Sequence, residues 1–135
     1  MDNRELISLA LEARKNSYSP YSLCKVGAAL LTKSGKVYTG CNIENAAYGP
    51  TVCAERTAVF KAVSEGEREF AKIAVAGGKG ETPDGYFFPC GVCRQVLAEF
   101  CAPGFEIITA VSPDDYVIKT LAELLPDSFG PDNLG

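Results

Sequence analysis

The feature that most constrains the fold is the order of the apolar segments along the chain. An apolar run of strand length, Val26 to Thr32, is followed by a turn sequence, Lys33 to Gly35, and by a second strand-like run, Val37 to Asn42. Helical and strand-like segments then alternate toward the C-terminus. A hairpin followed by such alternation predicts an α/β fold in which helices pack on a mixed sheet.

Helices are expected where apolar residues recur at three- and four-residue steps. Asp2 and Glu5 resemble a capping box at the start of the first helix. The inward-facing residues expected in the third helix are Val92, Val96, Leu97 and Phe100. The helical segments run from Arg4 to Asn16, from about Cys53 to Ser64, from Gly91 to Phe100 and, for a single turn, from Leu121 to Leu125.

The rest of the chain supplies further strands and two loops. Strands are expected at Lys72 to Ala76, Glu106 to Val111 and Tyr116 to Lys119. Turn-forming residues mark Ile43 to Val52 and Gly77 to Gly85 as loops. No repeat or linker divides the chain, and its 135 residues suit one compact domain, residues 1–135.

The charge balance argues against one class of partner. With 13 Lys and Arg against 17 Asp and Glu, the net charge is −4, which disfavours general electrostatic binding of nucleic acid. The N-terminal sequence mixes acids and bases and lacks the apolar core of a signal peptide. No apolar run approaches the length of a membrane span. We therefore expect a cytoplasmic protein without a nucleic-acid or membrane partner.

The chain has 6 cysteines and no histidine, which restricts its chemistry. In the cytosol, cysteines are more often metal ligands, reactive thiols or buried apolar residues than disulfides. Without histidine, a Ser-His or Cys-His nucleophile is impossible. Any zinc site must be built from Cys, Asp or Glu.

A group of three cysteines forms the most specific pattern. Cys90 and Cys93, in the segment PCGVCRQ, share one face of a helix, so both sulfurs can reach one ion. Alone, this spacing also fits a redox pair or two buried thiols. Cys53 lies at the start of another expected helix, where the helix dipole favours a thiolate. Three thiolates are the number of protein ligands typical of a catalytic zinc with an open position.

The other cysteines bear on an alternative, a zinc-stabilised structural module without turnover. Such a closed site normally has a fourth ligand, and Cys24, Cys41 and Cys101 are each conceivable. None of them has a ligand-like neighbour in the sequence. We therefore interpret all three as small apolar residues.

Glu55, in the segment TVCAERTA, suggests a reaction for the cysteine cluster. A carboxylate beside a catalytic zinc can accept a proton from a water whose pKa the metal lowers to about 7, and can pass it to a substrate. Positions i and i+2 of a regular helix face differ by about 200°, so either Cys53 stands at the cap or Glu55 reaches around. The negative charge of three thiolates exceeds the positive charge of Zn²⁺, and the cation of Arg56 or Arg94 can offset the excess. Taken singly, all three charged residues would be ordinary helix residues.

Together these patterns resemble the small cytidine deaminases, zinc enzymes whose site of three cysteine ligands adjoins a glutamate that is not a ligand. The absence of histidine fits this branch rather than the nucleotide and nucleic-acid deaminases that use a His ligand. The resemblance spans most of the chain. It rests on GCNIENAAYG (Gly40 to Gly49), CAERTA (Cys53 to Ala58), PCGVCRQVL (Pro89 to Leu97) and ELLP (Glu123 to Pro126).

The resemblance implies a three-layer α/β/α fold with a mixed five-stranded sheet, assembled as a homotetramer. It implies hydrolytic deamination of cytidine and 2'-deoxycytidine to uridine and 2'-deoxyuridine plus ammonia, in pyrimidine salvage. One Zn²⁺ per subunit would be bound, and Glu55 would move the protons. The implied zinc ligands are Cys53, Cys90 and Cys93.

The same resemblance implies contacts with the substrate. Asn42 and Glu44 would hydrogen-bond the ribose hydroxyls, and Ala54 would offer backbone contacts to the base. Arg56 would hydrogen-bond the ligand thiolates. Phe129 matches an aromatic residue that reaches the site of a neighbouring subunit, although packing on its own subunit is an equal alternative.

Two segments depart from the pattern of this family. The family often has an aromatic residue after PYS-x, whereas this chain has Leu23 and Cys24, which makes Cys24 a candidate pocket-lining residue. Before the PCGVC segment, Phe87 and Phe88 stand where a small hydroxyl residue is common. These differences keep a second hypothesis open, a related deaminase acting on another aminopyrimidine, such as a modified or antibiotic nucleoside.

Overall fold

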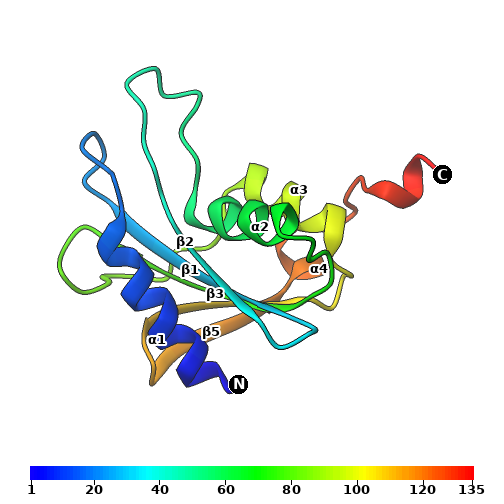
Figure 1. Cartoon of the computed structure of the whole chain (residues 1–135), viewed down its shortest axis with the longest axis horizontal. Coiled ribbons are helices and arrows are strands. Elements are labelled where there is room, and N and C mark those ends of the chain that lie inside the picture. The colour runs from blue at the N-terminus through cyan, green and yellow to red at the C-terminus, as the bar shows by residue number, and fades with distance from the viewer.

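The computed structural model describes residues 1–135 and contains one five-stranded sheet with helices on both faces (Figure 1). Strand β1 (Lys25–Thr32) pairs antiparallel with β2 (Val37–Cys41) and with β3 (Phe70–Gly78). Strand β3 pairs in parallel with β4 (Glu106–Ser112), which pairs antiparallel with β5 (Asp115–Thr120). The predicted mixed sheet is therefore confirmed, with the order β2-β1-β3-β4-β5.

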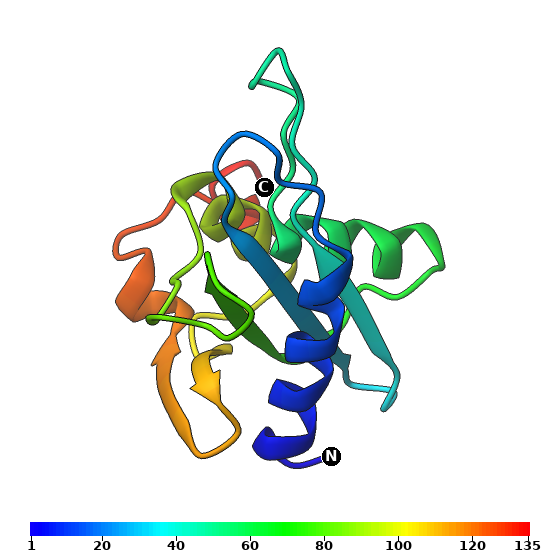
Figure 2. The ribbon, with the colours of Figure 1, turned by 90° about the vertical axis from the view of Figure 1, so that its left-hand side faces the viewer.

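The helices form the two outer layers. Helix α1 (Asn3–Ala13) covers one face of the sheet, and α2 (Ala54–Ser64) and α3 (Gly91–Phe100) lie side by side on the other (Figures 1 and 2). The short helix α4 (Leu121–Leu124) packs beside them, as Leu121 belongs to the same apolar core. A smaller core lies between α1 and the sheet. This confirms the three-layer α/β/α prediction.

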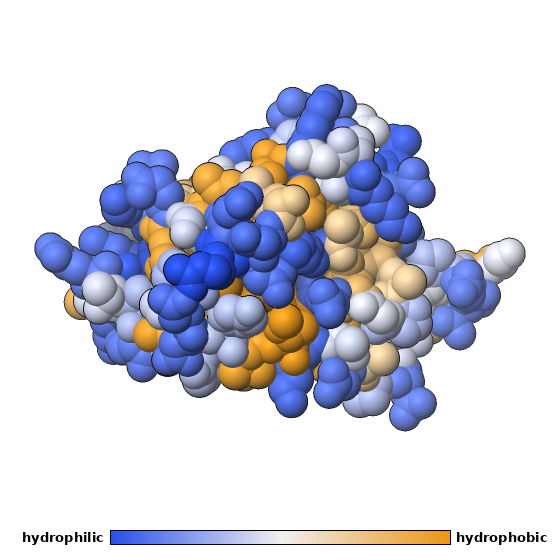
Figure 3. Space-filling model, turned by 90° about the horizontal axis from the view of Figure 1, so that it is seen from below, coloured by the Kyte–Doolittle hydropathy of each residue, from blue (hydrophilic) through white to orange (hydrophobic).

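The burial of the strands follows their place in the sheet. Ile73 to Ala76 in the central strand β3 are buried on both faces, so this stretch is continuously apolar. At the edge, β5 leaves Tyr116 and Ile118 partly exposed. Seen from below the view of Figure 1, hydrophobic surface gathers between hydrophilic residues (Figure 3). None of the helices has both the length and the apolar character needed to cross a membrane.

Most of the expected elements are confirmed, with shifted ends. The first helix ends at Ala13 and continues as a 3-10 turn, Arg14–Asn16. The Asp2 carboxylate caps it by accepting a hydrogen bond from the Glu5 backbone N–H at 2.8 Å. Strand β3 runs two residues into the predicted loop, because Gly77 and Gly78 still pair with β1.

One prediction about the third helix is wrong. The apolar pattern places Val92 on the inward face, but this residue is 57% exposed. Cys93 and Leu97 are the buried residues of α3. Because neighbouring positions on a helix differ by about 100°, the orientation that buries Cys93 turns Val92 toward solvent.

A glycine in β2 allows α2 to lie close to the sheet. A Cβ atom on Gly40 would lie 2.5 Å from the Ala54 carbonyl oxygen and 2.6 Å from the Ala58 amide nitrogen. Both are backbone atoms of α2, so they cannot move away without shifting the helix. The first turn of α2 carries site residues, and this close contact therefore helps to position them.

We predict that Gly40→Ala lowers the free energy of unfolding by about 1–3 kcal/mol, because the added methyl group must displace helix backbone. Urea unfolding followed by circular dichroism measures the change. The matched control is Gly104→Ala, where nothing lies within 4 Å of an added Cβ. Unfolding midpoints that coincide for the two variants would contradict this account of the packing.

Candidate active site

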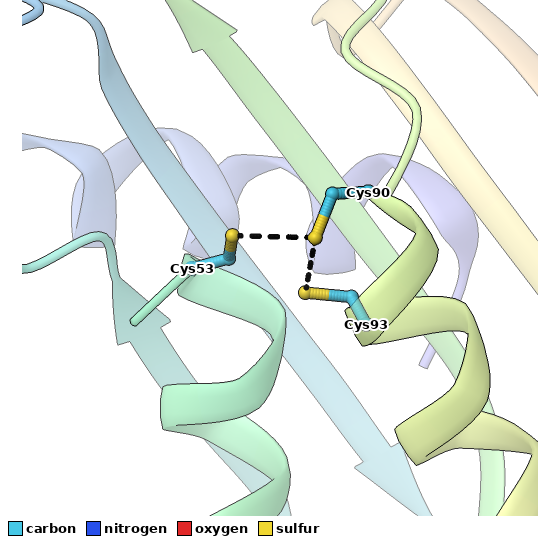
Figure 4. A group of neighbouring side chains, drawn as sticks. All are labelled: Cys53, Cys90 and Cys93. Carbon is cyan, nitrogen blue, oxygen red and sulfur yellow. Dashed lines mark hydrogen bonds between the residues drawn. The ribbon is translucent and has the colours of Figure 1, made fainter. Parts of the chain in front are cut away.

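The three predicted ligand cysteines converge from two helices (Figure 4). Cys53 is the N-cap of α2, Cys90 is the N-cap of α3, and Cys93 lies in the first turn of α3. The Cys53 and Cys90 sulfurs are 3.6 Å apart, and the Cys90 and Cys93 sulfurs are 3.5 Å apart. All three sulfurs lie within 4.8 Å of one another, so they can share one metal ion.

The N-cap position of Cys53 resolves the geometric question raised by its spacing from Glu55. Cys53 has extended backbone angles, φ −73° and ψ 158°, so its side chain does not follow the helical rotation. Glu55 lies inside the first turn of α2 and is 4% exposed. The cysteine and the glutamate can therefore face the same space although they are two positions apart.

Burial raises the pKa of the Glu55 carboxyl to about 7. Water solvates a carboxylate far better than a protein interior does, so burial favours the protonated form. A carboxyl group with this pKa both accepts and donates a proton near neutral pH, as a general acid and base must. The environment of Glu55 thus fits the role predicted for it.

The thiol cluster is prepared for ionisation. Hydrogen bonding with Cys93, supported by Arg56 and Cys90, lowers the pKa of Cys53 to about 5. The pKa of Cys93 is raised by its hydrogen bond with Cys53 and by burial. One thiolate therefore forms readily, and a nearby positive charge is needed for the others.

The two arginines considered from the sequence have different positions. Arg56 donates a hydrogen bond from Nη2 to the Cys53 sulfur at 3.5 Å, while its buried Nε has no partner. Arg94 instead donates to the carbonyl oxygens of Pro89, at 2.6 Å, and Leu124, at 2.7 Å. Arg56 is thus the cation at the sulfurs. Arg94, which taken singly would be an ordinary helix residue, ties α3 to α4.

A cavity of about 260 Å³ lies beside the sulfur cluster. It brings together residues from β1, the loop after β2, the start of α2, β3 and the segment before α3. Cys93, which is fully buried, does not line it. The lining residues are Val26, Asn42, Glu44, Thr51, Val52, Cys53, Ala54, Glu55, Val75, Phe87, Phe88 and Cys90.

The polar end of this cavity is held rigidly. Asn42 Oδ1 accepts a hydrogen bond from the Val26 N–H at 2.9 Å, and its Nδ2 donates to the Cys24 carbonyl oxygen at 2.8 Å. Glu44 Oε1 accepts from the Tyr21 N–H at 2.9 Å. The Ser22 hydroxyl, which also bonds this carboxylate, keeps the pKa of Glu44 below its usual range. Glu44 is therefore a fixed anion in the cavity wall.

Some candidate residues lie elsewhere. Cys24 is outside the set that lines this cavity, and it meets Asn42 through its backbone. Phe129 is 58% exposed near the C-terminus, where its carbonyl oxygen accepts a hydrogen bond from Gln95. Burial raises the pKa of Cys101 to about 12, which fits its interpretation as an apolar residue. The sequence did not reveal Val26, Val75 and Thr51 as lining residues, because only the fold brings these segments together.

The residues present fit a zinc ion. Zinc prefers sulfur and nitrogen ligands, and three protein ligands leave a position for water or substrate. Here three sulfurs gather at two helix N-termini, where the helix dipoles favour thiolates. The guanidinium of Arg56 lies against them and offsets their charge. Cys53, Cys90 and Cys93 would hold the metal.

The fold and this site fit one class of protein, the zinc-dependent hydrolases. Residues 1–109 match a family model described as "Cytidine and deoxycytidylate deaminase zinc-binding region". The chain belongs to the cytidine and deoxycytidylate deaminase family, and its cofactor is Zn²⁺.

Similar proteins cover nearly the whole chain. A cytidine deaminase of Sporosarcina psychrophila is 47% identical, over 99% of this chain and 96% of its own length. One of Halalkalibacterium halodurans is 48% identical, over 99% of this chain and 98% of its own. A crystal structure of cytidine deaminase from Burkholderia pseudomallei superposes with a TM-score of 0.87 at 47% identity, covering 96% of this chain and 100% of that one.

We predict that Cys93→Ala reduces the zinc content to below about 0.1 ion per chain after dialysis. The variant has only two of the three thiolate ligands, and two thiolates bind zinc too weakly to retain it. Mass spectrometry of the metal measures the content. The control variant is Cys41→Ala, which removes a half-buried thiol of β2 outside the cluster and should keep its zinc. Equal zinc content in both variants would exclude the cluster as the metal site.

Proposed function

We propose that this chain hydrolyses cytidine and 2'-deoxycytidine to uridine and 2'-deoxyuridine with release of ammonia. The observation that carries this proposal is the cavity in which the buried Glu55 carboxyl lies beside the Cys53 and Cys90 thiols. The similarity to proteins named cytidine deaminase supports the same substrate.

We further propose that residues 1–135 act as one catalytic domain in pyrimidine salvage. The 6 free thiols suit a reducing, cytoplasmic compartment.

The reaction adds water to C4 of the pyrimidine and expels the amino group. When bound, Zn²⁺ supplies Lewis-acid activation of a water molecule, lowering its pKa to about 7. Glu55 takes a proton from the attacking water and delivers it to N3 of the base. It then takes the remaining water proton from the new C4 hydroxyl group and delivers it to the departing amino group, which leaves as ammonia while the C4 carbonyl forms. A carboxyl group with a pKa of about 7 suits both directions of transfer.

The other cavity residues orient the nucleoside. Glu44, a fixed anion, accepts hydrogen bonds from ribose hydroxyls. Asn42 lies next to it and contributes the remaining amide hydrogen. The N–H of Ala54 belongs to the first turn of α2, whose amides have no intrahelical partner, so it can bond the base. Arg56 stabilises the thiolates rather than the substrate.

We also propose that the protein assembles as a homotetramer. The outer surface of α2 and α3 exposes Phe60 by 48% and Val92 by 57%, which is costly in water unless covered. Phe129 is 58% exposed near the C-terminus, and this exposure supports a contact with another subunit. In this arrangement Phe129 reaches the site of a neighbouring subunit.

We predict that Glu55→Gln retains zinc but lowers kcat at least by about 10²–10⁴-fold, because the amide cannot carry the proton. Ammonia release and the loss of cytidine absorbance measure turnover, with metal content determined on the same sample. Glu65→Gln, an exposed residue just past the end of α2, is the control and should turn over normally. Near-normal turnover in Glu55→Gln would refute the mechanism.

A second candidate substrate class is another aminopyrimidine nucleoside, favoured by the two phenylalanines in the cavity wall. We expect kcat/KM for cytidine and 2'-deoxycytidine to exceed that for cytosine by at least about 10²-fold, because cytosine lacks the sugar that Glu44 binds. A steady-state comparison of these three substrates and an antibiotic nucleoside decides the question. A clear preference for the antibiotic nucleoside would favour the second candidate.

A further inference from the structure

The apolar wall of the cavity comes from the segment between β3 and α3. Phe87 and Phe88 both line the cavity, and Cys90 follows two residues after Phe88. Phe88 remains 37% exposed, so part of its ring is available for contact. Leu23 and Cys24 do not line this cavity. The segment before α3 therefore brings aromatic rings directly beside the thiol cluster.

A missing side chain in β3 sets the position of Phe87. Gly77 pairs with Val26 across the central strands. A Cβ atom on Gly77 would lie 2.6 Å from Phe87 Cδ2 and 3.1 Å from Val26 Cγ2. The Phe87 ring thus packs directly on the backbone of β3, at a distance that only glycine permits.

The start of the same segment is anchored by a buried cation. Arg14 is 4% exposed and donates hydrogen bonds to the carbonyl oxygens of Gly78 at 2.7 Å, Gly80 at 2.5 Å and Glu81 at 2.8 Å. Its Nε donates to the Lys25 carbonyl oxygen at 2.9 Å. These bonds join the segment to the ends of β1 and β3.

The end of the segment is held as well, just before the aromatic pair. The Tyr86 hydroxyl donates a hydrogen bond to the Asp115 carboxylate at the start of β5. With both ends held and the Phe87 ring seated on Gly77, the wall is formed before substrate enters. A preformed wall contributes affinity without the entropic cost of ordering it.

We propose that Phe87 and Phe88 contact the pyrimidine base and determine its affinity, with Gly77 as the positioning residue for Phe87. This inference rests on the proposed function. The polar residues Asn42 and Glu44 serve the sugar, whereas an aromatic wall offers the flat π-face of a base a stacking or edge contact. The wall acts on binding of the base and leaves proton transfer by Glu55 unchanged.

The first test measures binding of the product. Phe87→Ala and Phe88→Ala should each raise the Kd for uridine about tenfold in calorimetry, the scale of a lost base–aromatic contact. The increase in KM should be equal for cytidine and 2'-deoxycytidine, because the wall touches the base and not the sugar, while kcat changes less than about threefold. Tyr116→Ala, a partly exposed aromatic of β5 outside the cavity, is the control and should bind uridine normally.

The second test asks whether Gly77 acts through Phe87. Gly77→Ala should weaken uridine binding in the wild-type background and have little further effect in Phe87→Ala, where the clash with the ring is gone. Additive effects would overturn the positioning role. The proposal that the two phenylalanines bind the base would be overturned if both Phe variants bound uridine with unchanged affinity. It would also be overturned if they changed subunit association but not uridine affinity. Cytidine turnover by the wild-type enzyme separates these results from a failure of the proposed function.

Discussion

The structure depends on the meeting of two helix N-termini on one face of the sheet. Helices α2 and α3 each begin on a cysteine with extended backbone, and this arrangement brings three sulfurs within 4.8 Å. Thiols so close together resist simultaneous ionisation, because like charges repel. The positive ends of both helices and the Arg56 guanidinium counter that repulsion. The close packing of α2 on Gly40 and of α3 beside it therefore serves the electrostatics of the metal site as much as the core.

The same helix start gives Glu55 an environment opposite to that of its neighbour. The Cys53 thiol, held by hydrogen bonds from Cys93 and Arg56, has a lowered pKa, whereas burial raises the pKa of Glu55. Two groups two residues apart thus favour opposite protonation states. This separation is what a hydrolytic site needs, because the metal ligands must be ionised while the proton carrier must be able to exchange its proton. Around them, Asn42 and Glu44 are held by backbone groups, so the polar end of the cavity is also preformed.

Much of this was predictable from local sequence. The bounds of α3 follow from patterns within a few residues, whereas the sequence left open whether Cys53 caps α2, and the structure shows that it does. Where the prediction for Val92 failed, a distant requirement had set the rotation of the helix: Cys93 must point toward a cysteine 40 positions earlier. The role of Arg94 was not predictable either, because its partner Leu124 lies 30 residues away, and nothing near Arg94 indicates that contact.

The sequence by itself determined the components of the candidate site: three thiols that could hold a metal without histidine, a glutamate two residues from one of them and an arginine next to that glutamate. Residue types and short spacings can be read directly from the sequence. Residues within the first turn of one helix also stay close together in any fold that contains that helix. Only the tertiary structure decided what surrounds them. The cavity joins β1, β3 and two connecting segments, and its aromatic wall is seated on Gly77 and anchored by Arg14. Such contacts depend on strand pairing and helix packing between distant segments, which local patterns do not encode.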